Sequence, residues 1–147
     1  IEAAAELARQ GRDNSASDTA GHDVWAHHFD RLYGAKCWFR TQQNIAAWIE
    51  SVHGYIEADD ATEKERCRAL VRHTVLDEKE NALDLLQHVE SAQTEWMIES
   101  ELGETTFIYG DNIAELLRKK IALMEGREDD EPFVDPDFMW RVPGINC

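Results

Sequence analysis

Apolar residues in the first half of the chain fall on two faces of one proline-free stretch, residues 24–58. At about 100° per residue, one set lies on one side of a helix: Trp25, Phe29, Leu32 and Tyr33. The second set lies on nearly the opposite side: Trp38, Ile45, Trp48, Ile49, Val52 and Ile56. Gly34 separates the two sets. This pattern predicts either a kink or two helices meeting near Gly34, or one helix sandwiched between two neighbours.

Two helix-start signals follow. Asp60 and Glu63 are spaced as a cap and the third helical residue, and predict a helix that runs to about Leu102. Its apolar stripe is Cys67, Leu70, Val71, Thr74, Leu85, Val89, Ala92 and Trp96. Asn112 and Glu115 repeat the signal and predict a helix to about Glu125. Its inward residues are Ile113, Leu117, Ile121 and Met124.

The remaining segments complete an all-α prediction. Residues 1–10 are strong helix formers, and the small polar residues 11–23 predict a loop. The β-branched and aromatic residues within about 104–110 predict one short extended segment. We therefore expect a helical bundle of three to five helices over residues 24–126.

Residues 127–147 form what we call the C-terminal arm. It contains an acidic run, residues 128–131, followed by all three prolines of the chain and several large apolar residues. Prolines prevent a continuous helix, and large apolar side chains favour burial. The arm therefore predicts a docking segment. The aromatic and apolar residues predicted to bind a partner are Trp25, Phe29, Phe107, Tyr109, Phe133, Phe138, Met139 and Trp140.

Charge narrows the classes of partner. Thirty acidic and fifteen basic residues among 147 give a net charge of −15. Such a charge repels nucleic acid and anionic membranes and favours a protein with a basic patch. The three cysteines match no disulfide framework or zinc pattern, which favours a reducing cytoplasm. Because the sequence starts at Ile1, a preceding leader stays an open question.

Metal chemistry is the sharpest alternative to a binding role. Glu50 and His53 form a Glu-x-x-His pair, the ligand unit of di-iron bundles, and His73 and Asp77 are four residues apart. A second Glu-x-x-His is absent, and these residues lie away from the predicted core stripes. We therefore predict no cofactor, with a metal ion at these four residues as the alternative.

A row of titratable residues also lies opposite the apolar stripe of the second long helix: His73, Asp77, Glu80, Asp84 and His88. The ordinary amphipathic pattern predicts that this row is a solvated acidic face. The alternatives are a site completed by another chain and a pH-sensitive contact.

No nucleophile, phosphate-loop or dinucleotide motif occurs, so we assign no catalytic residue. The sequence predicts a non-catalytic assembly or regulatory subunit of a larger bacterial multi-subunit enzyme complex, without an active site of its own. Its partners would be larger protein subunits of a hetero-oligomer. Two alternatives stay open: a small di-iron or hemerythrin-like oxidoreductase, and an acidic adaptor that binds a basic protein surface.

Overall fold

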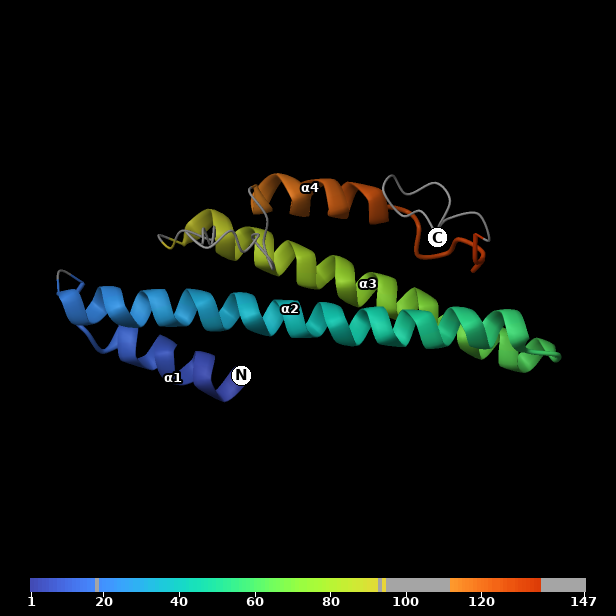
Figure 1. Cartoon of the computed structure of the whole chain (residues 1–147), viewed down its shortest axis with the longest axis horizontal. Helices are drawn as coiled ribbons and strands as arrows, with labels where there is room; N and C mark the ends of the chain where they lie inside the picture. The colour runs from blue at the N-terminus through green and yellow to red at the C-terminus, as the bar shows by residue number, and fades with distance from the viewer. Residues whose placement is uncertain (18, 93, 95–111, 136–147) are drawn as a thin grey trace, which may run out of the picture.

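The structure, a computed structural model, describes residues 1–17, 19–92, 94 and 112–135. Within these residues it contains four helices and no strand, which confirms the predicted all-α fold (Figure 1). The helices are α1 (Glu2–Asp13), α2 (Ala20–Glu57), α3 (Ala61–Ser91) and α4 (Ile113–Met124). The predicted extended segment at 104–110 and residues 136–147 of the C-terminal arm lie outside the described residues.

The two apolar faces belong to one continuous helix. The 38-residue α2 passes Gly34 without interruption, with α1 packed against it on one side and α3 on another (Figure 1). The sandwiched helix is therefore the correct alternative, and the kink near Gly34 is wrong. In the second apolar set Val52 is buried, whereas Ile45, Trp48, Ile49 and Ile56 are 44–47% exposed.

The predicted polar loop at residues 11–23 is too long. Helix α1 continues to Asp13, and α2 begins at Ala20, where the Thr19 side chain accepts a hydrogen bond from the backbone N–H of His22. Gly11 is part of α1 and lies at a point where α1 comes very close to α2. A Cβ atom at Gly11 would lie only 2.5 Å from the Trp25 ring. Gly11, which the sequence assigned to a loop, is instead a helical residue packed against Trp25.

Helix α3 runs back along α2 and begins as predicted. The Asp60 side chain accepts hydrogen bonds from the backbone N–H groups of Thr62 and Glu63, both at 2.9 Å. The predicted end near Leu102 is wrong, because the helix ends at Ser91 and Ala92 has an extended backbone. Beyond this turn, the Thr94 hydroxyl donates to the carboxylate of Asp30 on α2 at 2.5 Å. The spacing of apolar residues along the sequence does not show that α3 ends here, next to this tertiary contact.

Helix α4 begins and ends close to its predicted bounds, and it covers part of α3. Asn112 caps it by accepting from the backbone N–H of Glu115, and Gly126 follows it with a φ of 69°. Its buried Leu117 joins a small core with Cys37, Ala82 and Leu85. The predicted inward face of α4 is confirmed, since Ile113 and Ile121 pack against this core.

Candidate partner-binding surface

The interface between α2 and α3, which we call the seam, consists mainly of small and polar residues. On α2 they recur at intervals of three, four and seven residues: Gly34, Cys37, Thr41, Asn44 and Ser51. On α3 the seam residues recur at intervals of four and three and include the apolar Val71 and Leu85: Cys67, Val71, Thr74, Glu78, Asn81 and Leu85. These spacings are those of a coiled coil. The sequence analysis placed Cys67, Val71, Thr74 and Leu85 in the apolar stripe of α3, but it missed the polar seam residues Glu78 and Asn81 and the seam residues of α2.

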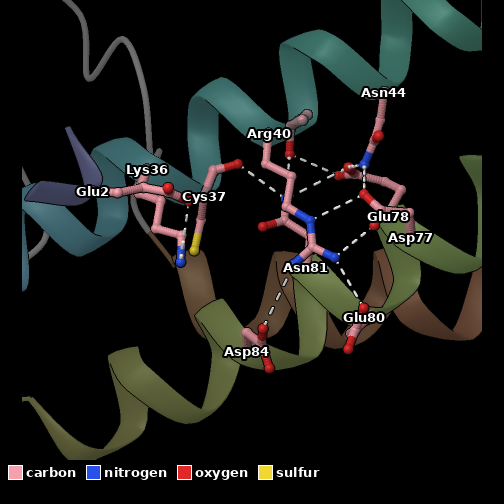
Figure 2. Close-up of polar contacts among 11 residues, drawn as sticks. Glu2, Lys36, Cys37, Arg40, Asn44, Asp77, Glu78, Glu80, Asn81 and Asp84 are labelled. Carbon is pink, nitrogen blue, oxygen red and sulfur yellow. Dashed lines mark hydrogen bonds and ion pairs between the residues drawn. The ribbon is translucent and has the colours of Figure 1, made fainter.

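Hydrogen bonds fill the centre of the seam (Figure 2). The Asn81 side chain, 2% exposed, donates to the carbonyl of Cys37 at 2.9 Å and to the Thr41 hydroxyl at 3.0 Å. The Thr41 hydroxyl and the Asn44 amide each donate to the Glu78 carboxylate, at 2.7 and 2.8 Å. Buried polar groups are tolerated when they are bonded in this way. The network therefore fixes how α2 and α3 align.

Glu78 also connects the seam to α4. Its carboxylate, on a residue 8% exposed, pairs with the ammonium group of Lys120. Burial acts to raise the pKa of Glu78, but the hydrogen bonds from Lys120, Asn44 and Thr41 outweigh it and lower that pKa. An ionised carboxylate thus holds three helices together.

The predicted solvated acidic face is wrong for Asp77, which is bound to α2, whereas the Glu80 and Asp84 side chains are 68% and 46% exposed. Arg40 of α2 donates to both carboxylate oxygens of Asp77, at 2.6 and 3.0 Å, and contacts Glu80 at 2.9 Å (Figure 2). Asp84 lies 3.7 Å from the same guanidinium group. The Arg40 hydrogen bonds hold the pKa of Asp77 below its usual range. These carboxylates face α2 because a single cation on that helix attracts them.

His88, at the end of the same row, is also not solvated. Its side chain is 12% exposed, lies 3.2 Å from the Asp30 carboxylate, and packs at 4.3 Å on the Tyr33 ring. Burial lowers the pKa of His88, while Asp30 acts in the opposite direction. His27 completes this cluster, with its Nδ1 atom 2.9 Å from the Thr94 hydroxyl. The cluster lies between helices and joins α2 to the end of α3.

The four metal candidates do not form a site. Glu50, His53 and His73 are exposed, and the Asp77 carboxylate is bound to Arg40 and Asn44. Among the residues described by the structure, no group of three or more His, Cys, Asp or Glu side chains is placed to hold a metal ion. Burial raises the pKa of the Cys37 thiol to about 11, which disfavours a reactive thiolate.

Large apolar residues line an open hollow instead of the seam. Ile45 and Trp48 of α2 are 46% and 44% exposed. They border a hollow with a volume of about 340 Å³, which we call the apolar groove. Its other apolar walls come from α2, α3, α4 and the start of the arm: Val52, Val71, Val75, Leu123, Met124, Pro132 and Phe133. Exposed apolar surfaces of this kind are typical of binding sites.

The chain that follows α4, including the acidic run of the arm, is folded back onto α3. Lys79 pairs with Glu125 at 2.6 Å, Arg72 pairs with Asp129, and Arg68 pairs with Glu131 at 3.1 Å. The order of these pairs shows that the chain runs from α4 towards the start of α3. The three cations share one face of α3, at spacings of four and seven, a signal that the sequence analysis missed.

The predicted partner-binding residues have different environments. Trp25 is 42% exposed and lies over Gly11, whereas Phe29 is packed internally, 5.3 Å from the His88 ring. Phe133 lines the apolar groove and is 72% exposed. The others lie outside the described residues: Phe107, Tyr109, Phe138, Met139 and Trp140. Ile45, Trp48 and Leu123 are groove residues that the prediction omitted.

The chain matches no family, no curated protein and no solved structure. In the part of the chain that the structure describes, no helix has the length and apolar character needed to cross a membrane.

Proposed function

We propose that this chain is a non-catalytic helical subunit, with an assembly or regulatory role, of a larger bacterial multi-subunit enzyme complex. The apolar groove is the observation that carries the proposal. It leaves Ile45, Trp48 and Leu123 between 44% and 65% exposed, although these are the residue types that favour burial most strongly. A partner that covers the groove would remove this apolar area from water.

The environment of the charged residues supports a binding role over catalysis. Arg40 and Glu78 are each engaged by several side chains from a neighbouring helix, and so act as structural connections. The chain's net charge of −15 favours a partner with a basic patch and disfavours nucleic acid and anionic membranes. We extend the proposal to a cytoplasmic location, where thiols such as the buried Cys37 and Cys67 stay reduced.

The test is the mass of the assembly that contains the full chain. We expect native mass spectrometry of the tagged chain, isolated from its own cells, to show a hetero-oligomer with defined stoichiometry. Trp48→Ser is expected to remove the partner while helical circular dichroism is unchanged. Leu76→Ser is the matched control, because Leu76 is 40% exposed and does not line the groove.

Two results would contradict the proposal. One is a stable monomer at micromolar concentration that copurifies with no stoichiometric partner. The other is a partner whose retention is equally insensitive to both substitutions. Elemental analysis of the same sample tests the alternative of a metalloprotein, because that alternative requires a transition metal in nearly stoichiometric amount.

A further inference from the structure

Helices α2 and α4 border a second hollow, in line with the apolar groove. Its volume is about 200 Å³, and its walls include Trp38 of α2 and Leu116 of α4. Lys120 lines this hollow and Glu78 lines the apolar groove, so their ion pair lies where the two hollows meet. We call the two hollows together the trough. It extends along α2 from Trp38 to Val52, which is about 21 Å at 1.5 Å per residue.

The packing of the helices leaves the trough open. Both α2 and α4 pack on α3, but within the described residues the backbones of α2 and α4 do not approach each other. Figure 1 shows α4 running in the same direction as α2 and ending well before α2 does. Among the described helices, α1 contacts α2 alone and so does not fill this space. Two helices that contact a third but not each other leave a channel, which a fourth helix fills in a four-helix bundle.

Both walls of the trough present residues at coiled-coil spacing. On α2 the intervals are three and four: Trp38, Thr41, Ile45, Trp48 and Val52. On α4 they are four and three: Leu116, Lys120 and Leu123. These are the intervals between the positions through which helices pack in a coiled coil. Leu116 and Leu123 are 53% and 65% exposed, as open as the apolar residues of the facing wall. The trough therefore has the form of a site for one more helix.

The border of the trough has an excess of negative charge. Residues 45–60 contain no Lys or Arg and four exposed acidic residues: Glu50, Glu57, Asp59 and Asp60. Residues 125–135 add six acidic residues, four of which are paired with cations. On α4 the exposed Lys119 lies four residues after Glu115, so this wall is nearly neutral. A second copy of the chain, with its net charge of −15, would bring like charges together, whereas a basic helix complements this border.

We propose that the trough holds an amphipathic α-helix of the partner, with apolar residues at intervals of three and four and with Lys and Arg at its flanks. This helix completes a four-helix bundle with α2, α3 and α4, and its cations lie along the acidic end of α2. Because the helix belongs to the partner, the proposal rests on the proposed function. It adds that recognition extends beyond the apolar groove to Leu116.

A synthetic peptide tests the trough on the isolated full chain. The probe is a fluorescent peptide of about three heptads, with leucine at the a and d positions and lysine and alanine elsewhere. One control peptide has the same composition with its leucines spread around the helix, and another has glutamate in place of lysine. We expect fluorescence anisotropy at physiological ionic strength to show that the probe binds at least about tenfold more tightly than either control. Its helical circular dichroism should increase on binding.

One substitution in each hollow locates the bound probe. Leu116→Ser and Ile45→Ser should each weaken its binding at least about fivefold, because the helix contacts both walls. Leu83→Ser is the matched control, since Leu83 is 46% exposed and lines neither hollow. Its affinity for the probe should stay within about twofold of wild type.

Three outcomes overturn the proposed helix. No binding, or equal binding of the probe and its same-composition control, shows that the trough does not recognise a helix. Weakening by Ile45→Ser but not by Leu116→Ser confines recognition to the apolar groove. A dimer of the chain that Leu116→Ser dissociates shows that a second copy fills the trough.

The proposed function can fail separately. If the probe does not bind as expected but Trp48→Ser still removes a partner isolated from cells, the proposed function stands without the helix. If the probe binds as expected and the chain has no partner in cells, the proposed function fails while the preference of the trough for a basic helix stands.

Discussion

The seam and the apolar groove lie side by side on α2 and reverse the usual distribution of side chains. In the seam, the half-buried Thr41 bonds to Glu78 and Asn81, which are both buried. In the groove, Ile45 and Trp48 remain nearly half exposed. The difference teaches that polar bonds align α2 with α3, while the exposed apolar residues of the groove are available for another surface.

The largest expected effect comes from placing a charge in the seam. Asn81→Asp removes the donors to Cys37 and Thr41 and adds a carboxylate 3.5 Å from Glu78. We expect a loss of about 3 kcal/mol in the free energy of unfolding at pH 7, measured by urea denaturation. Gln87→Glu, the same chemical change at an exposed position of α3, should cost less than about 0.5 kcal/mol.

This substitution also has a defined pH dependence. Burial without donors raises the pKa of the new carboxyl above its unfolded value, so its charged form is the destabilising one. The deficit should therefore shrink as the pH falls from 7 towards 5, when the carboxyl becomes protonated. A deficit that grows over this interval, or equals that of Gln87→Glu, would contradict the role of the seam.

A smaller effect is expected at Arg40, on the flank of the seam. Arg40→Leu leaves Asp77, Glu80 and Asp84 without their shared cation. We expect a loss of about 1–2 kcal/mol at pH 7, reduced by partial exposure of the pairs. Arg40 lowers the folded pKa of Asp77, so its stabilisation is present above the unfolded pKa and is lost as the pH falls through the folded value.

The corresponding measurement is a pair of urea midpoints for wild type and Arg40→Leu from pH 7 to pH 3. The difference should be constant near neutral pH and should narrow below about pH 4, where aspartate begins to protonate. Arg9→Leu is a suitable control, because Arg9 pairs only within the exposed face of α1. A difference that persists unchanged at pH 3 would show that Arg40 acts through packing alone.

Adding one methyl group at Gly11, in the contact between α1 and α2, should lower the stability of the fold. Gly11→Ala places a Cβ atom 2.5 Å from the Trp25 ring, so we expect a loss of about 1 kcal/mol despite the better helix propensity of alanine. Gly21→Ala, where the nearest side-chain atom is 3.8 Å away, should be neutral or slightly stabilising. Thermal unfolding that ranks the two variants in the opposite order would refute the close packing of α1.

The smallest effect on stability is expected at the groove. Ile45→Ser and Leu83→Ser remove equally exposed apolar side chains, both 46%, from long helices. Each should change the free energy of unfolding of the isolated chain by less than about 1 kcal/mol, as for other surface positions. A much larger loss for Ile45→Ser in urea denaturation would show that Ile45 belongs to the core.

The starts of α3 and α4 could be predicted because they depend on neighbouring residues, whereas the start of α2 at Ala20 lies within the predicted loop. The caps Asp60 and Asn112 lie where the local pattern placed them. The end of α3 could not be predicted in the same way, because it coincides with the contact between Thr94 and the distant Asp30. The sequence around Gly11 also predicted a loop, because neighbouring residues carry no information about its contact with the Trp25 ring.

The candidate site was harder to predict than the fold. Following apolar residues identified Ile45 and Trp48 as one face of a helix, but did not show that this face would stay open. The polar series Thr41, Asn44 and Ser51 has the spacing of a coiled-coil seam, yet polarity assigns such residues to solvent. Thr41 and Asn44 are instead bonded to Glu78 and Asn81, which lie more than thirty residues away on another helix.

The most direct test of the central claim compares the affinities of Ile45→Ser and Leu83→Ser for the purified partner. The account predicts that Ile45→Ser weakens binding at least about tenfold, equivalent to about 1.4 kcal/mol, while Leu83→Ser stays within about twofold of wild type. Equal affinities for the two variants, with both chains folded, would contradict the claim that the apolar groove is the partner-binding surface.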